Sequence, residues 1–154
     1  MISDIAGLSA ENYIVFKGED SAEQTIITYT PTSNADNDAK YVLILDSVSN
    51  ITFQDLTISI TDTTTSFVID VNHSENITFN QMTFATPHSV TPDLFKVRNT
   101  NNITFTNNNF YGSSNQIKSE DAITTLNINN NKFYDFGTTA LELSNISGLQ
   151  INNN

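Results

Sequence analysis

Cysteine and tryptophan are absent from the 154-residue chain. Without cysteine the protein has no disulfide bond, no thiol nucleophile and no zinc–thiolate centre. Long apolar runs are absent too: no stretch approaches the roughly 18 residues that a membrane-spanning helix needs, which argues against membrane insertion. The first residues, MISDIAGLSAENY, have neither the basic start nor the apolar run of a signal peptide.

Basic residues are scarce. Six lysines and arginines stand against 17 aspartates and glutamates, which gives a formal net charge of −11. Phosphate-bearing partners require a basic surface, so this balance argues against nucleic acid and against anionic membranes. Asparagine and threonine are abundant instead, with 22 and 21 residues that make up more than a quarter of the chain. Both are poor helix formers and threonine favours strands, so the composition favours an all-β protein.

The sequence repeats itself. Ile51, Ile77 and Ile103 mark nearly identical phrases at a spacing of 26 residues, and Leu126 and Leu149 continue the series at a spacing of 23. Apolar and polar residues alternate within each repeat, which is the period of a β-strand. A fixed period of about 20 to 50 residues is typical of a solenoid. A second apolar column lies two positions further on: Phe53, Phe79, Phe105, Ile128 and Ile151.

Another apolar stretch precedes four of the repeats, at residues 41–46, 66–71, 93–98 and 139–144. The position that faces outward in it holds Ile44, Asp70, Lys96 and Glu142, and Lys96 above Asp70 predicts an ion pair between coils. The inward positions form two uniformly apolar columns: Leu43, Ile69, Phe95 and Leu141, and Leu45, Val71, Val97 and Leu143.

Because each strand can stack on its own copy in the next repeat, we predict a parallel β-solenoid. It has five to six rungs and a repeat of 23–26 residues, and its shorter repeats have shorter loops. We expect a single domain over residues 1–154, with residues 1–12 as an N-terminal cap and residues 13–154 as coils. The last coil stops in mid-repeat at LQINNN, so we expect a truncated protein or an uncapped end that pairs with a second copy.

Asparagine accumulates at the turn after the second apolar column. Asn108, Asn131 and Asn154 occupy the position that Leu56 and Met82 hold in earlier repeats. Asparagine tolerates a left-handed backbone, and stacked asparagine amides can bond to one another from rung to rung. The column therefore predicts an inward asparagine ladder, the alternative being a turn preference without a ladder.

The phrases NITFQDLTI, NITFNQMTF and NITFTNNNF resemble the right-handed parallel β-helix of the pectate-lyase-like superfamily. The opening, ISDIAGLSAENYIVFKGEDSAEQTIITY, resembles the first coil of long secreted β-helix proteins of Bacteroidetes-type bacteria. The resemblance implies right-handed coils and an extracellular or cell-surface location. It leaves the function open, because this fold serves lyases, glycosidases, adhesins and plain stalks alike.

The resemblance to polysaccharide lyases implies a basic residue that works beside calcium-binding carboxylates. Arg98, the single arginine of the chain, is the candidate, and it shares a column with Asp46 and Asn72. A glycosidase needs neighbouring carboxylates, and the one tight acidic pair at an expected strand start is Glu120–Asp121. The competing interpretation of Arg98 is a solvated or ion-paired side chain. Neighbouring strand residues point to opposite faces, and no second acidic cluster shares the column, so the acidic pair alone does not make a site. Asp121 is also the candidate for a calcium or sugar site, and we expect no other cofactor.

Two tyrosines offer a different kind of site. Tyr111 and Tyr134 are 23 residues apart, one position past the core residues Phe110 and Phe133, so they should lie side by side on neighbouring rungs. A pair of exposed tyrosine rings is a candidate platform for stacking a sugar, the alternative being an ordinary surface stripe. The two histidines, His73 and His88, lie in expected loops without the spacing of a metal motif, so we expect no metal there.

These patterns favour a non-enzymatic extracellular or cell-surface β-helix module. We expect it to act as a spacer or adhesive scaffold with weak carbohydrate contact. Its expected partners are a polysaccharide or another surface protein, and a second copy through the uncapped coil. The alternative is a carbohydrate-active enzyme, of the polysaccharide lyase or glycosidase kind, or a fragment of one. A third interpretation is a minimised solenoid made to study folding.

Overall fold

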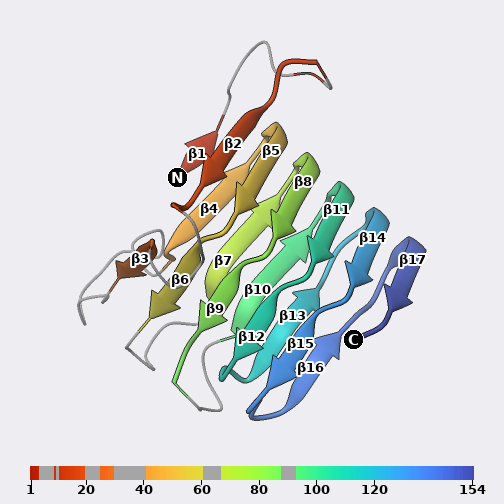
Figure 1. The fold of residues 1–154 in the computed structure, drawn as a ribbon. Helices are drawn as coiled ribbons and strands as arrows, with labels where there is room; N and C mark the ends of the chain where they lie inside the picture. The colour runs from red at the N-terminus through yellow and green to blue at the C-terminus, as the bar shows by residue number, and fades with distance from the viewer. Residues whose placement is uncertain (4–8, 10, 20–24, 30–40, 61–66, 88–92) are drawn as a thin grey trace.

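A computed structural model of the chain describes all residues except 4–8, 10, 20–24, 30–40, 61–66 and 88–92. The described residues form 17 β-strands and no helix. The strands pair in parallel into three sheets that run side by side along the molecule (Figure 1). This arrangement confirms the predicted all-β parallel solenoid.

The strands follow one another in a regular order, one in each sheet per turn. Sheet A consists of β1 (Ile2–Ser3), β4 (Leu43–Asp46), β7 (Phe67–Asn72), β10 (Asp93–Arg98), β13 (Asn115–Ser119) and β16 (Thr139–Glu142). Sheet B consists of β2 (Ile14–Lys17), β5 (Ser49–Gln54), β8 (Glu75–Asn80), β11 (Asn101–Thr106), β14 (Ile123–Asn129) and β17 (Ile146–Asn152). Sheet C consists of β3 (Ile26–Tyr29), β6 (Thr57–Ile60), β9 (Thr83–Ala85), β12 (Asn109–Tyr111) and β15 (Lys132–Tyr134).

Strands β4 to β15 form four successive turns, and the remaining strands extend the three sheets at their ends. Equivalent residues of successive repeats pair directly, as in Ile51 with Ile77 and Ile77 with Ile103. The register of the predicted columns is therefore correct. The right-handed sense and the count of five to six rungs stay predictions.

One strand of sheet A was not predicted from the sequence. Strand β13 carries Ile117 directly between Phe95 and Leu141 in the inward column. Its next inward residue is Ser119, which pairs with Val97, so the column that we predicted to be uniformly apolar is interrupted by a hydroxyl. The Ser119 hydroxyl is satisfied within the protein, because it donates a hydrogen bond to the carbonyl of Ser144.

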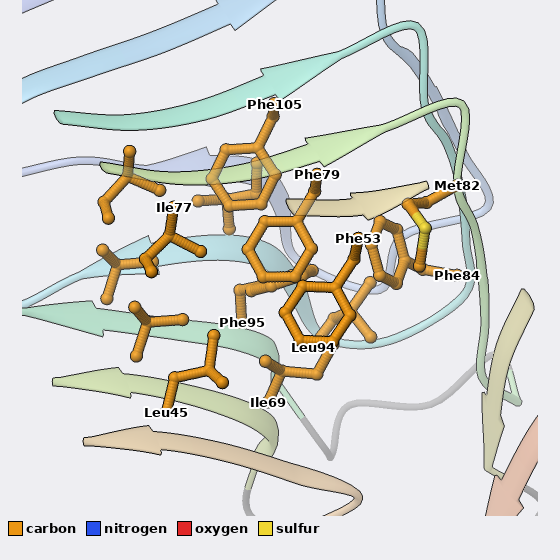
Figure 2. Packing of buried hydrophobic residues seen from close by; sticks show 14 of the residues in the cluster. Leu45, Phe53, Ile69, Ile77, Phe79, Met82, Phe84, Leu94, Phe95 and Phe105 are labelled. Atoms are coloured by element: carbon orange, nitrogen blue, oxygen red, sulfur yellow. The ribbon is translucent and has the colours of Figure 1, made fainter. Parts of the chain in front are cut away.

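Stacked phenylalanine rings fill the centre of the solenoid. Figure 2 shows the ring of Phe79 between those of Phe53 and Phe105. Phe79 is fully buried, and its ring centroid lies 5.3 Å from that of Phe53 and 5.2 Å from that of Phe105. Phe95 meets Phe79 edge-on from sheet A at 5.0 Å. Aromatic pairs favour both offset-stacked and edge-to-face geometries, so the coils are tied together along the axis and across it.

The predicted asparagine ladder is present at the turns between sheets B and C. The Asn108 amide nitrogen donates to Oδ1 of Asn131 at 2.9 Å, and the Asn131 amide nitrogen donates to Oδ1 of Asn154 at 3.0 Å. The Oδ1 atoms also accept backbone N–H groups, as Asn108 Oδ1 does from Met82 at 2.8 Å. Asn108 and Asn131 are buried, so each side chain supplies the partners that a buried turn would otherwise lack.

The shorter repeats lose residues in loops, as predicted. Residues 86–92 join β9 to β10, whereas only residues 112–114 join β12 to β13. The tight loop depends on Gly112, whose φ of +76° suits glycine and whose hydrogen faces the carbonyl oxygen of Thr86.

Candidate functional site

The outward positions of sheet A carry most of the charged candidates. Asp70, Lys96, Lys118 and Glu142 follow one another in register along one column. Lys96 and Lys118 are therefore direct neighbours, which is unfavourable unless each ammonium group has an acidic partner. Each has one: Nζ of Lys96 lies 2.7 Å from Glu120, and Nζ of Lys118 lies 3.5 Å from Glu142.

Arg98 is the last residue of β10 and forms the best-defined ion pair on this face. Its Nη2 donates to Oδ2 of Asp70 at 2.8 Å and its Nε donates to Oδ1 at 3.3 Å. The pKa of Arg98 is raised above its ordinary value, mainly by this hydrogen bond and then by the negative charge of Asp70; burial opposes the shift, and Tyr41 and Glu120 add to it. The guanidinium therefore stays protonated.

A small pocket of about 170 Å³ opens beside this ion pair. Asp46 and Asn72 line it together with Arg98, and the Asn72 amide nitrogen donates to Oδ1 of Asp46 at 3.2 Å. The stacked column of Asp46, Asn72 and Arg98 that we predicted is thus present. The full lining consists of Met1, Tyr41, Ile44, Asp46, Asp70, Asn72 and Arg98.

The acidic pair Glu120–Asp121 lies in the turn between β13 and β14, which corrects our placement of it at a strand start. The turn spans residues 120–122, whereas the equivalent turn before β11 spans only 99–100. Glu120 reaches Lys96, and Oδ2 of Asp121 accepts a hydrogen bond from the Asn99 amide at 3.4 Å. The two carboxylates therefore serve different neighbours.

A shallow groove of about 400 Å³ runs past this wider turn, from the coil of β7 and β8 to that of β13 and β14. Thr100 lines it and is buried, and its hydroxyl has no hydrogen-bond partner among the described residues. His73, one of the two histidines, also lines the groove, and its Nδ1 lies 3.5 Å from Asp46; His88 lies outside the described residues. The other lining residues are Ser74, Glu75, Asn99, Asn101, Ala122 and Thr124.

The two tyrosines lie on a different face, the outer face of sheet C. The rings of Tyr111 and Tyr134 stack at 4.8 Å between centroids and are within 9° of parallel. Both remain exposed. Behind them, buried Gln116 donates from Nε2 to the carbonyl of Tyr134 at 2.7 Å and to that of Gly112 at 3.0 Å, which fixes the backbone under the pair.

The candidates therefore divide between two faces. Arg98 and Glu120 are close enough for Glu120 to act on the pKa of Arg98, whereas the tyrosines belong to another sheet. No group of three or more histidine, aspartate or glutamate side chains suited to a metal ion occurs among the described residues. No helix capable of crossing a bilayer occurs among them either. Calcium at Asp121 stays a prediction.

Comparison of the chain with protein-family models, with curated proteins and with solved structures gives no match.

Two contacts of these sites were not anticipated from the sequence. We expected Asp70 to meet Lys96, its register partner, and that ion pair stays a prediction. The contact of the Asp70 carboxylate with Arg98, which lies two positions beyond Lys96 on the same strand, was not expected. The polar support from Gln116 was also missed, because the strand that carries it has a single large apolar residue, Ile117, and reads as a loop.

Proposed function

We propose that the chain is a non-enzymatic β-helix module of an extracellular or cell-surface protein, which acts as a scaffold and contacts carbohydrate. The observation that carries this proposal is that each candidate catalytic side chain is engaged in an ion pair or a hydrogen bond with another residue of the chain. Arg98 binds Asp70, Glu120 binds Lys96, and Asp121 accepts a hydrogen bond from Asn99. Every one of these contacts joins two coils, which is what a scaffold requires.

The electrostatics of Arg98 also favour a structural role. A residue that removes a proton from a sugar must first lose its own, so an effective general base has a pKa near the working pH. The neighbourhood of Arg98 raises its pKa instead. Arginine in this setting is suited to binding a carboxylate through two parallel hydrogen bonds.

Carbohydrate contact is supported by the tyrosine pair. Exposed tyrosine rings combine an apolar face with a polar hydroxyl, a combination that suits sugars. Tyr111 and Tyr134 are 41% and 40% exposed, although large aromatic side chains usually contribute to a core. A right-handed coil of the pectate-lyase-like kind belongs to this proposal, supported by the right-handed preference of parallel crossovers.

The alternative is a carbohydrate-active enzyme, and the pocket of about 170 Å³ beside Arg98 is the observation that favours it. Pockets for drug-sized ligands span about 300–1,000 Å³, so this one would admit a single small ring. Its carboxylates and amide could hydrogen-bond a hydroxyl-rich ligand. The ion pair with Asp70 would have to break before Arg98 could act on it.

A glycan array, read with and without calcium for both bound protein and released product, separates these functions. Binding without product is expected for an adhesive module. Product release would overturn the non-enzymatic proposal and direct mutagenesis to Arg98 and Glu120. No binding to any glycan would leave a plain spacer and remove the carbohydrate contact from the proposal.

A further inference from the structure

The column that contains the tyrosines changes abruptly in size. Ser59, Ala85, Tyr111 and Tyr134 are register partners on four successive strands of sheet C. They face outward, because they alternate along their strands with core residues such as Phe84 and Phe110. Two small side chains are therefore followed by two large rings, which leaves a step in the surface at Ala85.

One ring face of Tyr111 is open above this step. Tyr134 lies on the edge strand of sheet C, whereas Tyr111 lies between two strands, yet Tyr111 is 41% exposed and Tyr134 is 40% exposed. A ring covered on both faces would be far less exposed than a ring covered on one. The near-equal values therefore indicate that each ring covers one face of the other, and that the second face of Tyr111 looks out over Ala85.

The backbone around the step is held in place. The Thr86 N–H donates to the carbonyl oxygen of Tyr111 at 3.0 Å, and the Thr86 hydroxyl donates to the same oxygen at 3.3 Å. Both bonds tie the chain after Ala85 to the strand that carries Tyr111. The open ring face and the floor of the step are thus parts of one rigid surface.

We infer that this step binds one uncharged sugar ring, stacked on the open face of Tyr111 above Ala85. The inference rests on the proposed carbohydrate contact and names its site. Neighbouring strands are about 4.8 Å apart, the same distance that separates the stacked tyrosine rings. A ring that continues the stack by one step therefore lies directly over Ala85. The C–H groups on one face of a pyranose suit the electron-rich face of an aromatic ring.

The chemistry around the step selects an uncharged sugar. The adjacent outward column runs through Thr57, Thr83, Asn109 and Lys132. Thr83 and Asn109 flank the step and offer a hydroxyl and an amide, while Lys132 lies on β15 beyond it. Among the described residues of these two columns no other side chain is charged, so neither column offers an acidic sugar a cationic partner beside Ala85. The chain's net charge of −11 also disfavours an acidic sugar.

The substitution Ala85→Leu tests this directly, because it fills the place assigned to the sugar without adding a new aromatic face above Ser59. Tyr111→Ala removes the platform. Thr78→Leu is the matched control, since Thr78 faces outward on sheet B and gains the same side chain away from the step. Thermal melting of the three variants would establish that each one folds.

The probes are three neutral hexasaccharides (cellohexaose, mannohexaose and hexa-N-acetylchitohexaose), hexagalacturonate, and N-acetylphenylalaninamide as a stand-in for an aromatic protein side chain. Binding would be measured by NMR titration of the Tyr111 ring and Ala85 methyl signals. We expect at least one neutral hexasaccharide to shift both signals. Its affinity should fall at least tenfold in Ala85→Leu and in Tyr111→Ala and stay unchanged in Thr78→Leu.

Three results would overturn the inference, and the third would also overturn the proposed carbohydrate contact. Unchanged affinity of a neutral hexasaccharide in Ala85→Leu and Tyr111→Ala would place the sugar elsewhere, with the proposed carbohydrate contact intact. Binding of hexagalacturonate alone would have the same meaning and would direct attention to the pocket beside Arg98. If none of the sugars binds, with or without a response to N-acetylphenylalaninamide, both the sugar site at the step and the proposed carbohydrate contact are wrong.

Discussion

The guanidinium of Arg98 and the carboxylate of Asp70 form two hydrogen bonds, with Nη2–Oδ2 at 2.8 Å and Nε–Oδ1 at 3.3 Å. The two residues are not register partners, because Arg98 pairs with Asn72 on β7 and Asp70 pairs with Lys96 on β10. The ion pair thus runs diagonally between two coils. Asp70 is only 5% exposed, so its carboxylate is largely shielded from water and needs hydrogen-bond donors from the protein.

Removal of the guanidinium should therefore destabilise the protein. Arg98→Met keeps the length of the side chain and leaves the Asp70 carboxylate buried without its strongest donor. An unsatisfied buried group costs about 1–3 kcal/mol, and more when it is charged, so we expect the free energy of unfolding in urea to fall by about 2–3 kcal/mol.

The double variant Asp70→Asn/Arg98→Met is the control for this prediction. It removes the buried charge together with its partner, and it should recover at least half of the lost stability. If the double variant is less stable than Arg98→Met alone, the pair does not depend on a compensated buried charge.

The inside and outside of the sheet B strands are tested by two adjacent residues. Phe79 is fully buried between two other phenylalanine rings, and Thr78 beside it points outward. Phe79→Asp removes an aromatic side chain worth about 3–5 kcal/mol and buries a charge, so we expect no folded protein by circular dichroism. Thr78→Asp should fold with a melting temperature within a few degrees of the parent. Similar behaviour of the two variants would contradict the assignment of the faces.

The parallel stacking could be predicted from the sequence because each coil repeats the same contact. Ile51, Ile77 and Ile103 are equivalent in sequence and also pair in the sheet, so spacing alone gives the register. The asparagine ladder could be predicted for the same reason, since Asn108 and Asn131 are equivalent positions of successive repeats and lie one above the other.

Features that depend on the length of a side chain, or on a local departure from the repeat, could not be predicted from the spacing of equivalent residues. The pair of Arg98 with Asp70 is diagonal, and only the length of the arginine side chain decides that it forms. Strand β13 carries polar residues, such as Gln116 and Ser119, at most of its positions, so it lacks the alternating apolar pattern of a strand. These side chains form hydrogen bonds to backbone carbonyl groups further along the chain. The open face of Tyr111 depends on a small residue one rung away, so neither residue signals it alone.

A second asparagine ladder, of Asn50, Asn76 and Asn102, lies exposed on the surface. It should contribute less to stability than the buried ladder of Asn108 and Asn131. Asn131 is 1% exposed and bonds to the Asn108 backbone N–H, the Asn108 amide and the Phe105 carbonyl. Asn131→Ala leaves these groups without partners in the core, so we expect a loss of about 2–4 kcal/mol in urea unfolding.

Asn76 provides the comparison. It is exposed, its φ is 53°, and its amide donates to Oδ1 of Asn50 at 3.1 Å. Asn76→Gly keeps the left-handed backbone at low cost and exposes the freed groups to water, so it should change the stability by less than about 1 kcal/mol. An equal loss in the two variants would show that burial does not govern the ladder.

Substitution of Gly112 should destabilise the protein, because both the backbone conformation and the space at this position suit glycine. Its φ is +76°, and a Cβ atom there would lie 2.0 Å from the carbonyl oxygen of Thr86. Gly112→Ala must therefore move the backbone on which the short loop of residues 112–114 depends, and we expect the free energy of unfolding to fall by more than about 2 kcal/mol.

Gly148 is the matched position, because a Cβ there would approach no atom closer than 3.1 Å, the distance to the Thr124 oxygen. Gly148→Ala should stay within about 1 kcal/mol of the parent in the same urea titration. Since Thr86 also anchors the strand of Tyr111, the Tyr111 ring signals in NMR spectra should shift in Gly112→Ala and not in Gly148→Ala; identical spectra would mean that the loop adapts without disturbing the step.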